Sequence, residues 1–379
     1  MSHQRFRLVP AFRHAACALA LLACGASAAA AQTFVDARLL TPPTPGDKPL
    51  KPYQIPPFRE ELRALVEGLA QYAETRDPKF ILIGREPLGL METSAWETQL
   101  RSLLDKKYLD REPVPDDAAG GPFRRVLRDF DAVALDDANC PKPKPAPDAR
   151  PPTKAEEMKA EGRIKRIAAI RKLGTPVVSL DTCNLAAADL AKKGAHDRTL
   201  AIVGVGTPGA PKPLPKQRPP FENSDAVTTL GDARNAFWLR SPRAYGAKTE
   251  WLEAMAKSNA DLLIVDAFYT ADQPLTKADV KAMQYKFMGP RRLVLAEIDL
   301  TAARDDRYYW KREWRIGETP FLREALPNPA DGVLTNYWLQ EWKTILGAYF
   351  VGLMDLGFDG VLIGGLNAAD RLEYELVLE

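Results

Sequence analysis

The sequence predicts a single-domain α/β protein with a (β/α)8 barrel. Short runs of consecutive apolar residues alternate with segments whose apolar residues recur at helical spacing. Short continuous runs of this kind are typical of parallel strands that are buried on both faces. Eight alternations favour a closed barrel, and a doubly wound open sheet is the alternative. The predicted strands are 80–83, 132–135, 177–180, 200–203, 236–239, 262–265, 293–298 and 360–363.

Segments with helical spacing separate most of these strands. The first has Leu62, Leu65, Val66 and Leu69 on one face of a helix. Two proline-rich segments, 141–152 and 208–220, interrupt the order and predict long loops that leave strand ends. The predicted helices are 58–75, 154–173, 186–193, 249–258, 277–285 and 341–356.

The first 31 residues have the pattern of a secretory signal peptide. Arg5, Arg7 and Arg13 precede a short apolar run, and small residues follow it. We therefore expect a periplasmic or extracellular protein with an extended arm over 32–57 and a barrel over 58–379. No stretch is apolar for the roughly 20 residues of a spanning helix. The Leu-Leu-Ala-Cys sequence ending at Cys24 approximates a lipoprotein site, so a lipid anchor is an alternative.

Composition argues against several classes of function. Beyond the signal segment, 49 basic and 50 acidic residues give a net charge of −1, which does not favour a nucleic-acid partner. His196 is the one histidine left there, and it lies in a polar turn, which argues against a Ser-His-Asp triad or a zinc site. Gly204, Gly206 and Gly209 have dinucleotide-binding spacing, but the prolines after them prevent the required helix. We therefore expect neither a metal nor a cofactor.

Aspartates follow the ends of several predicted strands. Asp136 and Asp137 follow the second strand, Asp181 the third, Asp266 the sixth and Asp299 the seventh. Active sites of (β/α)8 barrels lie at these strand ends, and glycoside hydrolysis uses a pair of carboxyl groups there. Acidic residues also commonly cap the helices that follow strands. The spacing alone leaves both interpretations open.

Cys140 and Cys183 stand at nearly the same offset after the second and third strands. Neighbouring strands lie about 4.8 Å apart, within the Cα separation that a disulfide spans. An oxidising compartment favours a disulfide between them, and two free cysteines are the alternative.

Aromatic residues gather on both sides of the loop between the last two strands. Aromatic rings stack on sugar rings, but they also fill protein cores. At this density we expect at least two of them to face a ligand. The candidates for sugar binding are Tyr309, Trp310, Trp338 and Trp342.

Four further segments occur in a recognisable order: Asn259-Ala-Asp-Leu-Leu-Ile-Val-Asp-Ala-Phe, Arg307-Tyr-Tyr-Trp, Tyr337-Trp with Glu341-Trp, and Phe358-Asp-Gly-Val. They resemble the endo-α-1,4-polygalactosaminidase-like family of glycoside hydrolases, once mislabelled as related to cysteinyl-tRNA synthetase. The resemblance covers nearly all of the chain beyond the signal segment. It implies a (β/α)8 barrel that hydrolyses an amino-sugar polymer internally, and it implies nothing about tRNA.

The chain departs from the family pattern at four acidic positions after the last two strands. These positions hold Ala302, Arg304, Gly364 and Asn367. The resemblance therefore implies a carbohydrate-active barrel whose catalytic acids are partly lost. An amide at Asn367 can still bind a sugar hydroxyl.

Two hypotheses about function follow. In the first, the protein is an endo-acting hydrolase that uses Asp266 and Asp181, assisted by Asp136 or Asp299. In the second, it is a non-catalytic polysaccharide-binding or structural protein of the periplasm. The missing acids predict hydrolysis that is absent or very slow.

Overall fold

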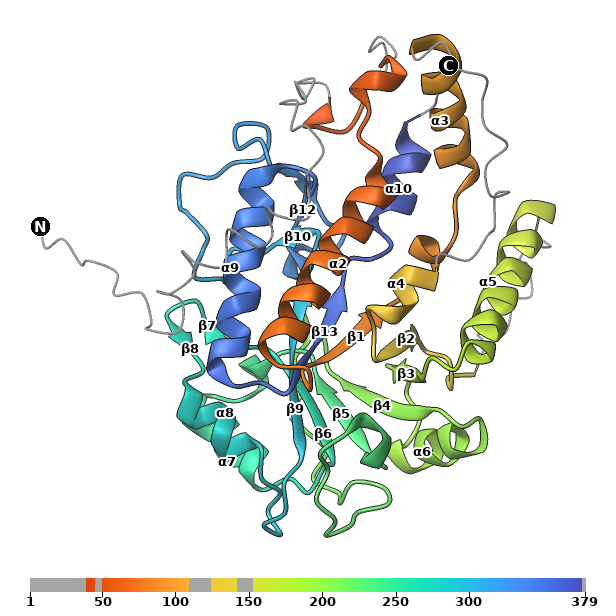
Figure 1. Ribbon diagram of the computed structural model, residues 1–379. Coiled ribbons are helices and arrows are strands. Elements are labelled where there is room, and N and C mark those ends of the chain that lie inside the picture. Colours follow the sequence, from red (N-terminus) through yellow and green to blue (C-terminus); the bar gives the residue numbers. More distant parts are fainter. Residues whose placement is uncertain (1–38, 45–49, 109–123, 142–152, 377–379) are drawn as a thin grey trace, which may run out of the picture.

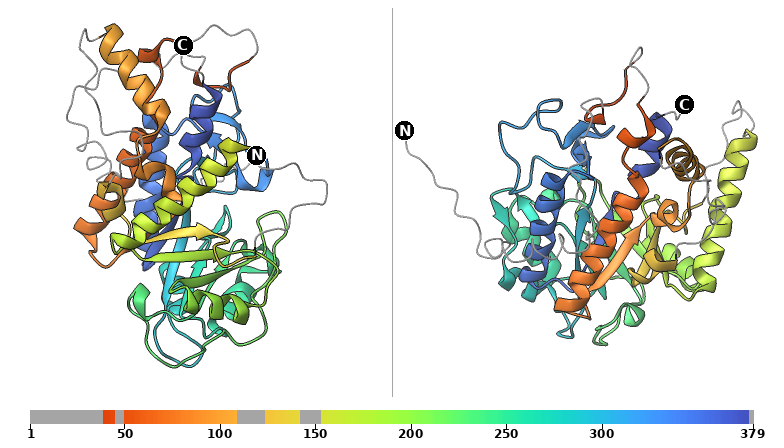
Figure 2. Two further views of the ribbon diagram at one scale, coloured as in Figure 1. Left: turned by 90° about the vertical axis from the view of Figure 1, so that its right-hand side faces the viewer. Right: turned by 45° about the horizontal axis from the view of Figure 1, so that its top comes forward.

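The chain folds into a closed barrel of eight parallel strands surrounded by helices (Figures 1 and 2). The computed structural model describes residues 39–44, 50–108, 124–141 and 153–376. Around the barrel the strand order is β1-β13-β9-β6-β5-β4-β3-β2. This closure confirms the predicted (β/α)8 fold over an open sheet. The strands are β1 (Ile81–Arg85), β2 (Ala132–Asp136), β3 (Val177–Asp181), β4 (Leu200–Val205), β5 (Ala236–Leu239), β6 (Leu262–Val265), β9 (Leu293–Asp299) and β13 (Gly360–Gly364).

All six predicted helices are present, with ends that differ from the prediction by a few residues. Sequence reading missed α3, although Trp96, Leu100, Leu103 and Leu104 have helical spacing, and it also missed the short helices α4 and α10. Within the described ranges, no helix is long and apolar enough to cross a membrane. The helices are α2 (Phe58–Arg76), α3 (Ala95–Tyr108), α4 (Arg124–Arg128), α5 (Lys154–Lys172), α6 (Ala187–His196), α7 (Lys248–Ala256), α8 (Lys277–Met283), α9 (Gln340–Leu356) and α10 (Ala368–Glu375).

The barrel strands bury both faces. Alternate side chains of each strand point into the barrel, and the others pack against the helices. Ile81 and Ile83 of β1 belong to the interior cluster, whereas Leu82 packs in the outer core. The interior cluster continues around the barrel with residues such as Leu180 of β3 and Leu295 of β9. This alternation determines which residues reach the end of the barrel.

The segment between β9 and α9 contains a small antiparallel sheet. It consists of β10 (Ala302–Ala303), β12 (Val333–Thr335) and β11 (Leu322–Ala325) in that order. The described part of the arm packs on this region, where the buried Asn336 donates its Nδ2–H to the Leu40 carbonyl at 3.1 Å. The predicted signal segment and Cys24 lie outside the described residues.

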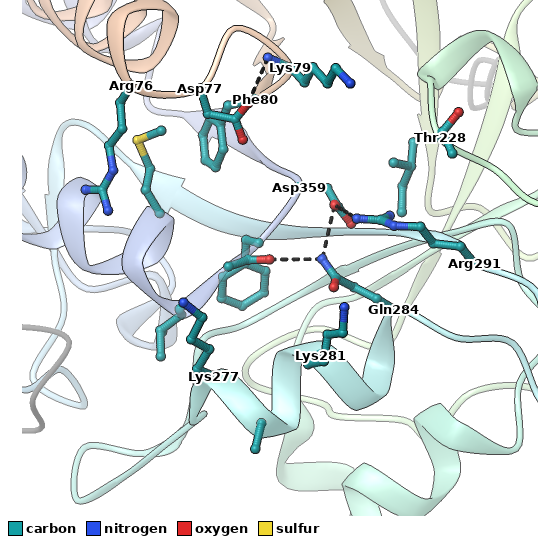
Figure 3. Close-up of a pocket in the computed structure, with 16 residues that line it drawn as sticks. Arg76, Asp77, Lys79, Phe80, Thr228, Lys277, Lys281, Gln284, Arg291 and Asp359 are labelled. Carbon is teal, nitrogen blue, oxygen red and sulfur yellow. Dashed lines mark hydrogen bonds and ion pairs between the residues drawn. The ribbon is translucent and has the colours of Figure 1, made fainter.

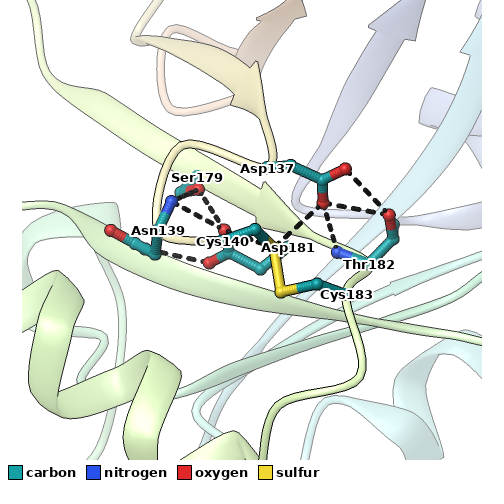
Figure 4. The surroundings of a disulfide bond; sticks show 7 residues. All are labelled: Asp137, Asn139, Cys140, Ser179, Asp181, Thr182 and Cys183. Atoms are coloured by element: carbon teal, nitrogen blue, oxygen red, sulfur yellow. Dashed lines mark hydrogen bonds between the residues drawn. A yellow bond between two sulfur atoms is a disulfide. The ribbon is translucent and has the colours of Figure 1, made fainter. Parts of the chain in front are cut away.

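A disulfide joins Cys140 to Cys183, which confirms the predicted pairing (Figure 4). Their Cα atoms are 5.9 Å apart. The Asp137 carboxylate accepts hydrogen bonds from the backbone N–H of Thr182 at 2.6 Å and from its hydroxyl at 2.9 Å. The covalent bond and these hydrogen bonds together hold the ends of β2 and β3 side by side.

Removing this disulfide is expected to destabilise the fold. The two cysteines are 43 residues apart, and closing a loop of that size stabilises by about 3–4 kcal/mol through the unfolded state. The double variant Cys140→Ser, Cys183→Ser should lose about this free energy in urea unfolding, and its m-value should rise because the unfolded chain without the cross-link exposes more surface. Thiol titration of the unfolded natural protein provides the control, since two free thiols per chain would contradict the disulfide.

Candidate functional site

Charged side chains line the mouth at the carboxyl ends of the barrel strands. Inside the barrel, the apolar alternation of β1, β2, β5, β6 and β9 ends and the next inward position is charged. On β1, for example, Arg85 follows Ile83, and on β9 Glu297 follows Leu295. The period of two along a strand sends these residues to the same end of the barrel. The mouth residues are Arg85, Asp136, Arg240, Asp266, Glu297 and Asp299.

Trp238 of β5 forms the floor of this mouth. Its side chain is fully buried. The guanidinium carbons of Arg85 and Arg240 lie 4.9 Å and 4.6 Å from the centroid of the indole ring, within the range of cation–π contacts. The indole Nε1–H donates to Glu297 Oε2 at 3.0 Å. Trp238 therefore positions two cations and one carboxyl group from three different strands.

Two of the mouth aspartates are held in ion pairs. Arg85 bonds Asp136 through two nitrogens, each 2.8 Å from a carboxylate oxygen. Arg307, in the loop after β9, donates to Asp266 Oδ2 at 2.7 Å, and both of these side chains are buried. The neighbouring Arg304 donates to Asp306 at 2.7 Å. Bidentate and buried pairs of this kind fix side chains and satisfy the charges.

Glu297 differs from these aspartates. It is partly exposed, and its hydrogen bond comes from the neutral indole of Trp238. Burial raises the pKa of the Glu297 carboxyl, and the charge of Arg85 and the Trp238 hydrogen bond offset this only in part. A carboxyl group that keeps its proton to higher pH is suited to donate that proton in catalysis.

Asp299 lies two residues further along the same face of β9. Burial raises the pKa of Asp299 as well. Hydrogen bonds from the backbone N–H and the hydroxyl of Thr301, at 2.8 Å and 3.1 Å, lower the pKa but offset this only in part. In the adjacent strand Gly364 pairs with Asp299, and a Cβ on Gly364 would lie 3.0 Å from Asp299 Oδ2. The carboxylate of Asp299 thus occupies the space beside the strand end that carries no side chain.

The raised pKa of Glu297 has a consequence for stability. A folded pKa above the unfolded value means that the contribution of Glu297 to stability is fully present below the unfolded pKa and is lost as pH rises through the folded pKa. Glu297→Gln keeps the shape and the acceptor for Trp238 without the buried charge. Its melting temperature should therefore exceed that of the natural protein increasingly as pH rises above about 4.3, the unfolded value of a glutamate. A difference that does not change with pH would contradict this assignment.

The structure brings Asp136, Asp266 and Asp299 to the mouth and places Asp181 elsewhere. Val178 and Leu180 of β3 face the barrel interior, so Asp181 points outward. It is fully buried and accepts hydrogen bonds from the Ser179 hydroxyl at 2.5 Å and from the backbone and side chain of Asn139 at 3.0 Å and 2.9 Å. These contacts, visible in Figure 4, give Asp181 a structural role in holding the β2 loop.

Two of the four aromatic candidates lie in the core. Trp342 is 1% exposed and donates its Nε1–H to the Leu300 carbonyl at 2.7 Å. Trp338 is 8% exposed, and its ring centroid lies 5.1 Å from that of Phe58 in α2. Both rings are buried where α9 begins and packs on the barrel, so this structure does not expose them to a ligand as the sequence predicted.

The other sugar-binding candidates keep some exposure. Tyr309 is partly buried next to the mouth, where its hydroxyl accepts the backbone N–H of Arg304 at 3.2 Å. Trp310 is partly buried and packs edge to face against Trp314. Asn367 is exposed at the N-terminus of α10.

Sequence reading missed Trp238, Arg240 and Glu297. The signal was present, because extending the period-two pattern of β5 leads from Ala236 to Trp238 and Arg240. The same extension on β9 leads from Leu295 to Glu297 and Asp299.

One group of potential metal ligands occurs among the described residues, namely Asp137, Cys140 and Asp181. The Cys140 sulfur is bonded to Cys183 and provides no thiolate. The hydrogen bonds that Asp137 and Asp181 accept also occupy their oxygens. The donor set does not fit a metal ion.

A cavity of about 790 Å³ opens at the opposite, N-terminal end of the barrel (Figure 3). Asp359 lies in it and accepts hydrogen bonds from Gln284 at 3.1 Å and from Arg291 at 2.6 Å. Residues at this end of a (β/α)8 barrel usually contribute to stability, whereas active sites lie at the carboxyl ends of the strands. We therefore assign the function to the charged mouth despite the size of this cavity.

The fold and the mouth define the class of protein: a (β/α)8 barrel with a cluster of arginines and acids at the carboxyl ends of its strands. No family model matches the chain. It is similar to uncharacterized proteins of Methanocaldococcus jannaschii (26% identity over 164 residues, 43% of this chain and 45% of that protein) and Deinococcus radiodurans (26% over 168 residues, 44% and 51%). A Thermotoga maritima protein matches over 80 residues at 32% identity, 21% of this chain and 24% of that protein. The matches span about half or less of these relatives.

Proposed function

We propose that this chain is a carbohydrate-active barrel that binds a saccharide at its mouth and cleaves the glycosidic bond slowly, with Glu297 as proton donor. The observation that carries the proposal is the state of Glu297. Its carboxyl is partly exposed and hydrogen-bonded by an indole, and burial raises its pKa. Glycoside hydrolysis requires such a proton donor for the leaving oxygen.

The second carboxyl that this reaction requires is Asp299. It shares the inward face of β9 with Glu297, about 7 Å further along the strand. Burial raises the pKa of Asp299, but the hydrogen bonds from Thr301 oppose that shift and orient the carboxyl group that a base or nucleophile needs. Asp136 and Asp266 then serve to hold Arg85 and Arg307, because their ion pairs use their carboxylate oxygens.

Saccharide binding without turnover is the second candidate function. It is favoured by the end of β13, where Gly364 has no side chain and Asn367 has an amide. A protein that only binds a saccharide does not require Glu297 or Asp299 to take part in a reaction. In both cases the disulfide supports a location outside the reducing cytoplasm, in the periplasm or the extracellular medium.

The test combines binding and product formation on the same samples. The purified natural protein is incubated for long periods with end-labelled oligosaccharides that carry carboxylate, neutral or amino groups. Binding together with new reducing ends supports the enzyme, and binding without them supports the second candidate. Absence of binding to all three kinds of saccharide would reject the proposal.

A further inference from the structure

Arg240 is the arginine of the mouth that has no anionic partner in the described part of the chain. Arg85 pairs with Asp136, Arg307 with Asp266 and Arg304 with Asp306. Among the described residues, Arg240 forms no ion pair, and its Nε has no hydrogen-bond partner. A partly exposed guanidinium that has no anionic partner among the described residues is available to bind an anionic ligand at the mouth.

The surroundings hold the Arg240 guanidinium in place. Its carbon lies 4.6 Å from the centroid of the Trp238 ring, a stacking contact that orients the planar group. Glu297, which shares that floor, accepts the indole N–H of Trp238. The side chain remains partly exposed at the mouth. A fixed, accessible guanidinium presents parallel N–H donors that match the two oxygens of a carboxylate.

We infer that Arg240 binds the carboxylate of an acidic saccharide at the barrel mouth. The inference rests on the proposed function, since it places a sugar at this end of the barrel, and it adds the chemical class of that sugar. The polymer implied by the family resemblance carries ammonium groups when deacetylated. Arg240 would repel such groups, whereas a uronic acid unit supplies the missing anion.

The inference is tested by calorimetric titration with three oligosaccharides of equal length. These are oligogalacturonate, its neutral methyl ester and a deacetylated, cationic oligogalactosamine. The natural protein should bind oligogalacturonate about 10–100-fold more tightly than the ester, because a hydrogen bond to a charged group contributes about 1.5–3 kcal/mol. The cationic oligosaccharide should bind most weakly.

Variants then assign the preference to Arg240. Arg240→Met should weaken oligogalacturonate binding by about 10–100-fold and change ester binding by less than about threefold. Arg240→Lys keeps the charge without the planar fork and should recover part of the loss. The matched control is Arg243→Met, which removes an exposed cation three residues away that donates to the Tyr269 carbonyl. It should leave all three affinities unchanged.

The outcomes separate this inference from the proposed function. Equal or tighter binding of the ester or the cationic oligosaccharide by the natural protein overturns the inference and leaves the proposed function standing. An acid preference that survives in a folded Arg240→Met protein overturns it as well. If Arg240→Met fails to fold, the acid-to-ester ratio of the natural protein and of Arg240→Lys decides. Absence of binding to all three overturns both proposals.

Discussion

Replacing Glu297 by glutamine is expected to lower the rate of glycosidic bond cleavage by about 10²–10⁴-fold, the usual contribution of a positioned proton donor. Glutamine keeps the size of the side chain and the oxygen that accepts the Trp238 N–H at 3.0 Å, but it has no acidic proton to give. Saccharide affinity should change little, since the shape of the mouth is retained. Release of labelled reducing ends and calorimetric binding measure the two effects separately.

The matched control for this variant is Glu324→Gln. Burial also raises the pKa of Glu324, which lies on β11 in the small antiparallel sheet and pairs with Arg371 at 2.7 Å. Its loss should leave the cleavage rate unchanged. In the natural protein the rate should also fall as pH rises through the raised pKa of Glu297. Cleavage by Glu297→Gln at the natural rate would show that another group donates the proton.

Replacing Lys286 by methionine is expected to destabilise the fold by about 3–5 kcal/mol, the cost of breaking a buried ion pair. Lys286 Nζ lies 2.5 Å from Asp261 Oδ1, and both side chains are fully buried. The lysine also donates to the backbone carbonyl of Asp225 at 2.8 Å. Methionine fills similar space, but it leaves the Asp261 charge without its partner. The free energy of unfolding in urea measures the loss.

Two further variants show whether the missing charge is the cause. Lys257→Met breaks the exposed pair with Glu253, whose two side chains are 70% and 69% exposed, and should cost less than about 1 kcal/mol. The double variant Lys286→Met, Asp261→Asn removes both buried charges and should recover part of the stability. A double variant no more stable than Lys286→Met alone would mean that lost packing, and not the unpaired carboxylate, dominates.

The aromatic and acidic candidates show which features of the site the local sequence predicts and which it does not. Density along the chain favoured Trp338 and Trp342 as ligand contacts, yet both are buried: Trp338 packs on Phe58 of α2, and Trp342 packs on Phe321 of the segment between β9 and α9. Trp238 stands outside this aromatic cluster in the sequence, and aromatic density does not mark it as a site residue. Its importance comes from β1 and β9, which bring Arg85 and Glu297 to its ring. A residue's exposure depends on what covers it, and the covering residues are remote in sequence.

The sequence by itself determined the eight strands, because apolar runs are local patterns, and it favoured the disulfide between Cys140 and Cys183 over two free cysteines from their equal offsets after neighbouring strands. Only the tertiary structure decided which strand-end acids reach the mouth. Val177 to Leu180 are buried on both faces of β3, so their sequence does not reveal the phase of alternation that turns Asp181 outward. Because side chains alternate between the two faces of a strand, a shift of one residue moves a strand-end side chain from the interior to the exterior of the barrel. The closure of the barrel determines which face each residue takes.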